Sequence, residues 1–375
     1  MDAALLTSEA FWKSSEPLAA GGFSGELPDE ERLSGCVLFE TSGSSGTPKW
    51  VALSKSALLA SAAAVNQHLR VTAGSCWGLA LPLHHVGGFG VGARAFNAGC
   101  RLEVFGKRWE AGAFSEWLAH SQVTHTSLVP TQVHDLVKAG LQAPQALQAI
   151  VVGGGHLDLA TGQAARDLGW PVLASYGMTE AASQIATQTP DQLKCPYQPA
   201  PIPVLPIWTA EVTTEELLRI SGPALFSGYV VMSDSGWRFF PRENEWHVTS
   251  DRVVLGEGGI IPLGRADMLV KVLGELVDPE AIERELVALS EGRLVVGTFA
   301  IVALRDERAG NVLVPVFESA CDASLVESTL AAYAKNASGF RRLLPAVFVQ
   351  EIPRSSLGKL LRKDLAVALE KKGFA

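Results

Sequence analysis

The first half of the chain alternates short apolar runs with longer, partly apolar segments. Short apolar runs bounded by turn residues predict buried strands, and the longer segments predict helices. Strands that alternate with helices favour a largely parallel α/β sheet. The predicted strands are residues 37–39, 50–53, 77–81, 101–105, 126–129, 149–152 and 172–173, and the predicted helices are 54–69, 90–98, 114–120, 130–138 and 160–168.

Ligands of parallel α/β sheets bind at the carboxyl ends of the strands, where the loops with unusual residues lie. We expect that position for the loops after Phe39, Leu81, Val152 and Ala174. The strands at 37–39 and 50–53 are expected to form a hairpin, followed by a helix that Ser54 caps.

The second half of the chain has a different pattern. Six prolines between residues 190 and 206 exclude a long helix, and weak alternation then predicts β-hairpins up to residue 263. A boundary at Gly264-Arg265-Ala266-Asp267 precedes a new series of elements. These are strands at 268–272, 294–304 and 312–317 and helices at 279–289 and 323–336. The predicted fold is α/β, with an abbreviated large N-terminal α/β domain that has a β-rich end (residues 1–264) and a small C-terminal α+β domain (265–375).

Composition narrows the class of protein. The chain has 375 residues, 47% of them apolar, and a net charge of −8, so general nucleic-acid affinity is not expected. No apolar run reaches the length of a membrane helix, and the first residues lack a secretory signal, so membrane insertion is not expected. The five cysteines form no C-x-x-C pair, which indicates neither a zinc site nor a disulfide framework. A cytoplasmic location is the default expectation.

The most unusual stretch lies inside the first predicted hairpin: Thr41-Ser42-Gly43-Ser44-Ser45-Gly46-Thr47-Pro48-Lys49. Glycines let the backbone approach a ligand, and successive N–H groups in such a turn bind anions. This predicts a phosphate-binding loop, although a flexible Ser/Gly turn would have a similar composition. It is not the common P-loop, because Pro48 precedes Lys49 and Trp50 follows where Ser or Thr would hold magnesium.

Further motifs carry residues suited to nucleotide chemistry. A carboxylate beside a hydroxyl suits Mg²⁺ bridged to phosphates, a carboxylate can accept both ribose hydroxyls, and a lysine on a glycine turn can neutralise a phosphoryl group. A turn aspartate or a basic solvated tail would be the plain structural alternatives. The motifs are Gly153-Gly154-Gly155, Ser175-Tyr176-Gly177-Met178-Thr179-Glu180, Trp246-His247-Val248-Thr249-Ser250-Asp251, Gly264-Arg265-Ala266-Asp267 with Lys271 and Gly274, and Pro353-Arg354-Ser355-Ser356-Leu357-Gly358-Lys359-Leu360-Leu361-Arg362.

In their order along the chain, these motifs resemble those of the acyl-adenylate-forming superfamily, which includes acyl-CoA synthetases and luciferases. The resemblance implies that Glu180 binds Mg²⁺, that Thr179 contacts the α-phosphate and that Tyr176 lies along adenine. The implied ATP-binding residues are the stretch from Thr41 to Lys49 (Pro48 apart), Gly153, Gly154, Gly155, Ser175, Tyr176, Gly177, Asp251 and Arg265.

The resemblance also implies a reaction in two halves. A carboxylate attacks the α-phosphate of ATP, giving an acyl-adenylate and pyrophosphate, and a thiol, most often coenzyme A, then displaces AMP. The implied catalytic residues are Lys359, Glu180 and Thr179. The small domain would rotate about Asp267 between the halves, so that Lys359 leaves and Lys271 and Gly274 line the coenzyme A channel.

Three positions depart from the family pattern: Ser250 replaces a glycine, Met268 an aspartate and Ala281 a glutamate.

Family members also have roughly a hundred residues more before the phosphate loop. We therefore expect an abbreviated N-terminal layer, with part of the acyl pocket wall missing or supplied by a partner subunit, and a homodimer is possible.

Two segments resemble the o-succinylbenzoate–CoA ligases of menaquinone and phylloquinone synthesis. They are residues 82–88 (PLHHVGG) and 175–186 (SYGMTEAASQIA). Ser183 and Gln184 would bind the distal carboxylate of the acid, or cap a helix instead. His85 would stack on the ring or carry charge, or be a core histidine. Another aryl- or short-acyl-CoA ligase and a non-catalytic adenylate-binding subunit are the competing hypotheses.

Overall fold

The computed structural model describes residues 2–41, 49–234, 236–355 and 360–371. The chain divides into two compact units. The first contains residues 1–249 and 254–261, and the second contains residues 250–253 and 262–375. The predicted division at 264/265 into an adenylation domain and a mobile domain also concerns function and movement, and it stays a prediction.

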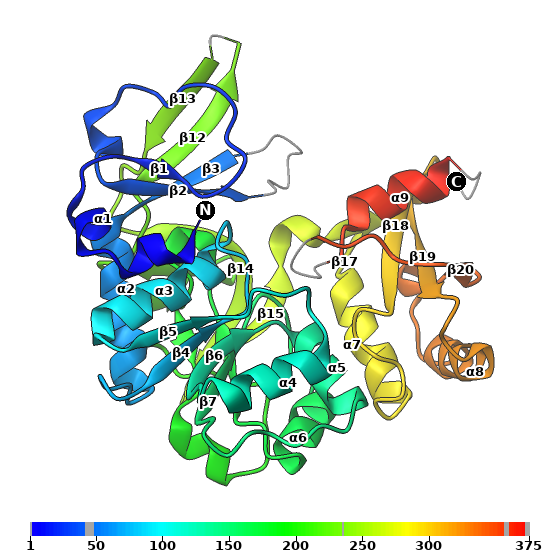
Figure 1. Cartoon of the computed structure of the whole chain (residues 1–375). Helices are drawn as coiled ribbons and strands as arrows, with labels where there is room; N and C mark the ends of the chain where they lie inside the picture. The colour runs from blue at the N-terminus through cyan, green and yellow to red at the C-terminus, as the bar shows by residue number, and fades with distance from the viewer. Residues whose placement is uncertain (1, 42–48, 235, 356–359, 372–375) are drawn as a thin grey trace. The chain divides into compact units, whose positions relative to one another are not determined.

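The first unit contains a six-stranded sheet in the order β5-β4-β6-β7-β8-β9 (Figure 1). All neighbouring strands are parallel except β8 and β9. The largely parallel sheet predicted from the alternating pattern is therefore confirmed. The strands are β4 (Cys76–Leu79), β5 (Arg101–Val104), β6 (His125–Leu128), β7 (Ala149–Val152), β8 (Val172–Tyr176) and β9 (Ala186–Thr187).

Helices pack against both faces of this sheet. Trp77 of β4 contacts Asn66 and Arg94 from one side, whereas a Cβ on the next residue, Gly78, would meet Trp117 from the other. Successive strand residues point to opposite faces, so these contacts place two groups of helices on the two faces (Figure 1). One group is α2 (Lys55–His68) and α3 (Val86–Ala98), and the other is α4 (Ala111–His120), α5 (Pro130–Lys138) and α6 (Leu159–Asp167).

A second sheet of this unit, in the order β1-β2-β3-β12-β13, contains the predicted hairpin. Its strands are β1 (Leu18–Ala19), β2 (Cys36–Thr41), β3 (Lys49–Ser54), β12 (Gly228–Ser233) and β13 (Gly236–Pro241). The strands β2 and β3 pair antiparallel, and Ser54 caps α2 as predicted by accepting a hydrogen bond from Ala57 N. The expectation for the loop after Phe39 was wrong. The strand β2 pairs with β1 on one side and with β3 on the other, so it belongs to this sheet and not to the six-stranded, largely parallel one.

The buried thiol of Cys36 lies at the start of β2. Its side chain is 1% exposed, its Sγ is 3.8 Å from Ser227 Oγ, and burial raises its pKa. Ser227 directly precedes β12, and its backbone N–H donates to Ala52 O of β3 at 2.7 Å. These contacts hold the entrance of β12 against the β2–β3 hairpin.

The N-terminal segment covers the outer side of α3. It contains the short helix α1 (Glu9–Lys13), and Leu6 packs so closely on Gly92 that a Cβ there would be 2.3 Å from Leu6 Cδ1. The rings of Phe11 and Trp12 contact Phe89. Lys55 ties the segment down, because its buried ammonium group donates to the carbonyl oxygens of residues 14 and 16 at 2.8 and 3.1 Å.

The proline-rich segment 190–206 contains no α-helix, as predicted, and it leads into a four-stranded sheet of order β10-β11-β14-β15. The strands are β10 (Thr209–Val212), β11 (Leu217–Ser221), β14 (His247–Gly256) and β15 (Gly259–Arg265). None of the helices that the structure describes has the length and apolar character needed to cross a membrane.

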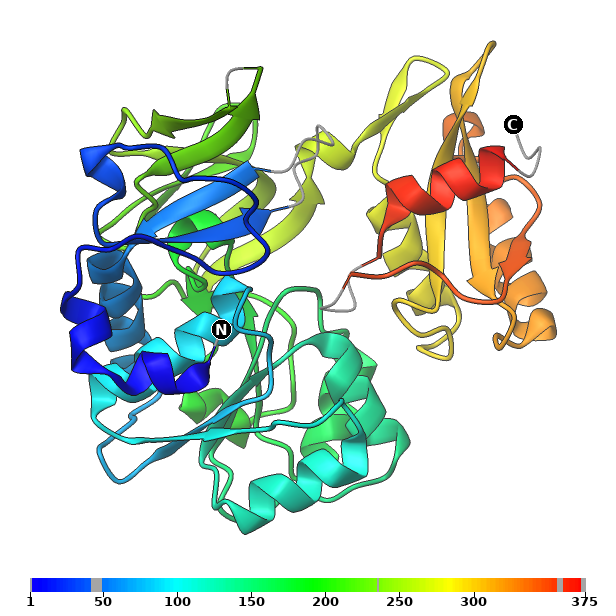
Figure 2. The same cartoon turned by 45° about the horizontal axis from the view of Figure 1, so that its top comes forward.

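The second unit is built on the sheet β18-β19-β20. Helices α7 and α8 pack on one face through Ile282 and Val326, and α9 packs on the other through Leu365 (Figure 2). The small α+β pattern was predicted, but α9 and β20 were not. The elements are β16 (Val270–Val272), β17 (Glu275–Val277), α7 (Pro279–Leu289), β18 (Phe299–Asp306), β19 (Gly310–Glu318), α8 (Ala323–Ala334), β20 (Val347–Val349) and α9 (Arg362–Glu370).

A half-buried ion pair fastens the start of α9 to α7. The Arg362 guanidinium donates to both oxygens of Glu283, at 2.5 and 2.8 Å, and Glu283 Oε1 also accepts from Ile301 N at 2.6 Å. Burial raises the pKa of Glu283, and the Arg362 charge opposes that shift. The more exposed Glu280 lies 3.4 Å from the same guanidinium. Residues from three elements therefore meet at one charge pair.

We predict that Glu283→Gln destabilises the second unit by about 3–5 kcal/mol, because it leaves the Arg362 charge without its main partner. Glu280→Gln is the matched control and should cost at most about 1 kcal/mol, since exposed pairs contribute little. Hydrogen exchange of the full chain, read over 279–304 and 362–370, measures both effects. Equal protection in the two variants would contradict the prediction.

A second prediction concerns His125, which is 1% exposed in β6 and lies 2.8 Å, through Nδ1, from Thr124 Oγ1. Burial lowers its pKa from 6.5 to about 4, so the folded chain binds the proton less well than the unfolded chain. Its contribution to stability is complete above pH 6.5 and falls by about 3 kcal/mol as the pH approaches 4. In His125→Asn, the difference in unfolding free energy between pH 7 and pH 4.5 should be smaller than in wild type, as measured by urea unfolding. An unchanged difference would contradict this assignment.

Candidate active site

Residues of two predicted motifs meet at the carboxyl edge of the parallel sheet. The pairs Leu128–Val152 and Val152–Ala174 fix the register of β6, β7 and β8, so the loops after β7 and β8 start at the same level. A Cβ built on Gly153 would lie 4.0 Å from the Cβ of Ser175. The structure therefore brings Gly153 and Ser175 together, with Gly154 and Gly155 exposed beside them in sequence.

The end of β8 is held by hydrogen bonds from Ser175. Its hydroxyl donates to Ala186 O at 3.1 Å and lies 3.1 Å from Thr187 Oγ1. Tyr176 follows and pairs with Ala186 in the antiparallel ladder to β9. These contacts fix the backbone direction at the point where the second predicted motif leaves the sheet.

A tight turn after β8 presents Thr179 and Glu180. A Cβ on Gly177 would lie 1.7 Å from the carbonyl oxygen of Ser183, so no other residue fits there without movement. Ala182 and Ser183 have left-handed φ values of +48° and +93°. The chain thus folds back on itself around a single 3₁₀ turn, η3 (Thr179–Ala181).

The carboxylate of Glu180 is held from the second sheet. Its side chain is 15% exposed, and Lys49 Nζ lies 3.6 Å from Glu180 Oε1. The hydroxyl of Tyr229 donates to the same oxygen at 3.1 Å, and Lys49 Nζ lies 4.1 Å from the centre of the Tyr229 ring. The structure therefore brings the predicted residues Lys49 and Glu180 together and adds Tyr229. Tyr229 belongs to none of the motifs. The sequence predicted only that it lies in a β-hairpin.

The predicted phosphate loop is described only at its ends. Thr41 and Lys49 form the last pair of the β2–β3 ladder, and the Thr41 hydroxyl donates to Lys49 O at 3.2 Å. The other members of the predicted loop lie outside the described residues. They are Ser42, Gly43, Ser44, Ser45, Gly46, Thr47 and Pro48.

Helix α3 begins directly after His85, the first of the predicted acid-binding residues. The His85 ring lies 4.3 Å from that of His84, and burial together with this neighbour lowers the pKa of His85 to about 4. His85 is therefore neutral at pH 7. Of the two substrate roles expected for it, stacking on a ring fits these surroundings better than carrying charge.

Arg94 lies on the same helix and belongs to none of the predicted motifs. Its side chain is 1% exposed, Nη1 donates to Ser127 Oγ at 3.1 Å, and the guanidinium lies 5.2 Å from the Trp77 ring. Burial lowers the pKa of Arg94 to about 9, so it is charged at pH 7, and no carboxylate among the described residues pairs with it. An arginine inside a helix of small and apolar residues was the signal that could have revealed it.

Two predicted residues of the acid pocket differ in their surroundings. A Cβ on Gly90 would lie 3.2 Å from Arg94 Nη2 and 3.8 Å from Ser183 Cβ, so Ser183 faces α3 near Arg94. Gln184 is 2% exposed, and its side-chain oxygen accepts a hydrogen bond from the Thr187 hydroxyl. Substrate binding by either residue stays a prediction.

In the second unit, the predicted ribose and hinge residues lie together. Arg265 Nη1 is 3.5 Å from Asp251 Oδ1, and the same guanidinium donates to both oxygens of Asp267 at 2.8 and 2.7 Å. The exposed Lys271 lies on β16, and Gly274 completes the tight β16–β17 turn with a φ of +91°. The predicted catalytic residue Lys359 lies outside the described residues.

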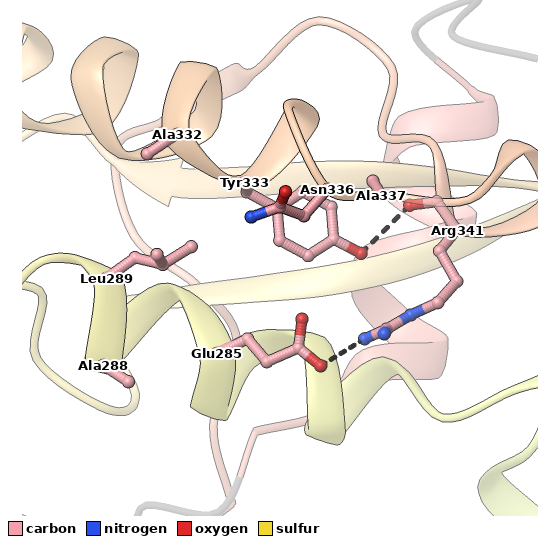
Figure 3. Close-up of a pocket in the computed structure, with 8 residues that line it drawn as sticks. All are labelled: Glu285, Ala288, Leu289, Ala332, Tyr333, Asn336, Ala337 and Arg341. Carbon is pink, nitrogen blue, oxygen red and sulfur yellow. Dashed lines mark hydrogen bonds and ion pairs between the residues drawn. The ribbon is translucent and has the colours of Figure 1, made fainter.

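A pocket of about 260 Å³ lies between α7 and α8 of the second unit (Figure 3). The Arg341–Glu285 ion pair and the ring of Tyr333 line it, and the Tyr333 hydroxyl donates to Arg341 O at 3.1 Å. None of the predicted site residues lines this pocket, and we assign it no role. Within the described residues, no group of three or more His, Cys, Asp or Glu side chains is arranged to hold a metal ion.

Comparisons with known proteins agree with these motifs. The family described as AMP-binding enzyme matches residues 5–230. A 2-succinylbenzoate–CoA ligase of Bacillus cereus is 28% identical over 345 residues, which cover 89% of this chain and 70% of that protein. The family match covers more than half of the chain. The match to the Bacillus cereus ligase extends the similarity into the C-terminal part of the chain.

Solved structures share the fold. An o-succinylbenzoate CoA synthetase of Bacillus subtilis, in complex with its acyl-adenylate intermediate, has a TM-score of 0.72 at 23% identity, with 88% of this chain and 68% of that chain covered. The same enzyme has been solved with ATP and magnesium ion. ATP-bound MatB of Rhodopseudomonas palustris has a TM-score of 0.74 at 21% identity, with 93% of this chain and 70% of that chain covered. Differently named enzymes match equally well, so these likenesses show the fold and do not select a substrate. From the family match and the motifs that the structure assembles, the chain belongs to the AMP-binding enzymes.

Proposed function

We propose that this chain is an ATP-dependent ligase that activates the carboxyl group of o-succinylbenzoate and transfers the acyl group to coenzyme A. The step would serve menaquinone or phylloquinone biosynthesis in the cytoplasm. The similarity to the Bacillus cereus ligase supports the reaction, and the residues around Arg94 support the acid. The oligomeric state, including a homodimer, is left to experiment.

The proposed reaction assigns roles to the predicted residues. The stretch from Thr41 to Lys49 would hold the ATP phosphates, with the adenine beside Gly153, Gly154, Gly155 and Tyr176. Asp251 and Arg265 would bind the ribose. Lys359 would contact the α-phosphate in the first half-reaction, and Lys271 and Gly274 would line the coenzyme A channel in the second, with Asp267 as the hinge. Residues 1–264 and 265–375 would be the two moving parts.

The surroundings of Glu180 fit a magnesium ion that arrives with ATP. Magnesium bound to nucleotide phosphates needs only one or two protein carboxylates, because phosphates and water fill its other positions. Glu180 supplies one carboxylate, fixed through a single oxygen by Lys49 and Tyr229. The ion would neutralise phosphate charge, while Glu180, Thr179 and Lys49 hold and orient the phosphates.

The single observation that carries the choice of acid is the buried charge of Arg94. A buried charge without a partner is strongly disfavoured, so its retention calls for a ligand that supplies one. An aromatic acid with a second carboxylate would pair with the guanidinium beside Ser183. The neutral ring of His85 starts the same helix and suits the aromatic part. Monocarboxylic acids would leave Arg94 unpaired.

A pyrophosphate-release assay with ATP, Mg²⁺ and coenzyme A tests the function on o-succinylbenzoate, benzoate, 4-hydroxybenzoate, acetate, hexanoate and decanoate. We expect strong preference for o-succinylbenzoate and loss of the signal when EDTA removes Mg²⁺. Preference for a simple aryl or short acid would keep the chemistry and overturn the substrate. No release with any acid would favour a non-catalytic adenylate-binding protein.

We predict that Arg94→Met raises the KM for o-succinylbenzoate about a hundredfold, as expected when one partner of a buried charge pair is removed. The KM for ATP should not change. Arg166→Met is the control for losing a stacked arginine, because the Arg166 guanidinium lies 5.0 Å from the Tyr197 ring. The assignment would be wrong if the two variants changed the KM for the acid equally.

A further prediction separates the half-reactions. Lys359→Ala should lose adenylation, since it removes the charge proposed to act on the α-phosphate, while still accepting preformed acyl-adenylate for transfer to coenzyme A. Pyrophosphate release measures the first half, and acyl-CoA formation from synthetic acyl-adenylate measures the second. Equal loss of both halves would count against the role given to Lys359.

A further inference from the structure

Tyr229 reaches Glu180 because of the register between β12 and β3. Tyr229 pairs with Val51, and Val231 pairs with Lys49. Directly paired residues of an antiparallel ladder point to the same face, and diagonal neighbours on that face are within reach of long side chains. The ring of Tyr229 and the ammonium of Lys49 are therefore diagonal neighbours, and both reach Glu180.

The position of the Tyr229 ring is fixed from several sides. It packs 4.7 Å from the ring of Phe226, and the preceding Gly228 lies so close to β13 that a Cβ there would be 2.3 Å from Phe240 O. The backbone N–H of Phe226 donates to Glu180 O at 2.9 Å. The hydroxyl of Tyr229 and the backbone of Glu180 are thus held by the same short segment.

The hydrogen bond from Tyr229 has a defined direction. A phenol is protonated at neutral pH and a carboxylate only accepts, so the Tyr229 hydroxyl donates to Glu180. Both Tyr229 and Lys49 approach Oε1 of Glu180. Within the described part of the chain, no side chain donates to Oε2, which is the oxygen left for another ligand.

We propose that Tyr229 is a positioning residue whose hydroxyl holds Oε1 of Glu180 so that Oε2 faces the divalent cation bound with the ATP phosphates. The proposal rests on the proposed function, which makes Glu180 the protein ligand of that cation. Lys49 alone would not fix the carboxylate, because a flexible ammonium can follow the phosphates when ATP binds. The rigid phenol of Tyr229 keeps the Glu180 carboxylate in place both before and after ATP binds.

The test compares Tyr229→Phe with Tyr197→Phe. The second variant removes another buried hydroxyl of the same unit, one that donates to Leu157 O at 3.1 Å and not to Glu180. ATP binding to the full chain is measured by calorimetry over a range of Mg²⁺ concentrations. We expect Tyr229→Phe to raise the half-saturating Mg²⁺ concentration about tenfold, the loss typical of one hydrogen bond to a charged group. ATP binding without Mg²⁺ should stay unchanged, and Tyr197→Phe should behave as wild type.

A second measurement separates positioning from general damage. In a Glu180→Gln background, Tyr229→Phe should have no further effect on the Mg²⁺ requirement, because the group that it positions no longer carries its charge. An independent, additive loss would overturn the proposal. The proposal would also be overturned if ATP binding to wild type depends on Mg²⁺ and Tyr229→Phe has the same half-saturating Mg²⁺ concentration as wild type. If Mg²⁺ had no effect on the affinity of wild type for ATP, the proposed function would be overturned, and this inference with it.

Discussion

Two consecutive backbone amides join the parts of the first unit on which the candidate site depends. Phe226 N–H donates to Glu180 O at the edge of the parallel sheet, and Ser227 N–H donates to Ala52 O of β3. These two bonds connect the turn after β8 with the β2–β3 hairpin. They join the turn that carries Glu180 to the sheet that carries Lys49 and Tyr229. The electrostatic contacts around the carboxylate are therefore a result of backbone pairing.

The sequence predicted the elements whose patterns are local. The parallel strands β4, β7 and β8 contain short, largely apolar runs, and the cap at Ser54 needs only the residue itself. The sheet to which β2 belongs was not predicted, because it depends on β12, which follows nearly two hundred residues later. Helix α9 was not predicted, because its short sequence starts with three charged residues and only Leu365 and Leu369 are buried in the core.

The candidate site shows the same division. Motif residues such as Glu180 and Lys49 could be named, and the structure brings them together. Arg94 and Tyr229 were not predicted, because neither lies in a motif and the contacts that give each its place in the site form only in three dimensions. The N-terminal layer was expected to be reduced, and the segment before β1 covers α3, the helix that carries Arg94. That cover comes from this chain, whereas a contribution from a partner subunit stays a prediction.

The thiol of Cys36 gives the junction between the two sheets a chemical marker. It lies beside Ser227, it is almost fully buried, and burial disfavours the thiolate that alkylating reagents need. Such a cysteine reacts only while the surrounding segment is transiently open, so its modification rate reports the free energy of that local opening. Because Cys36 is part of the natural sequence, the opening of this junction can be measured without introducing a labelled residue. Any ligand that tightens the contact between the hairpin and the turn after β8 would slow the alkylation of this thiol.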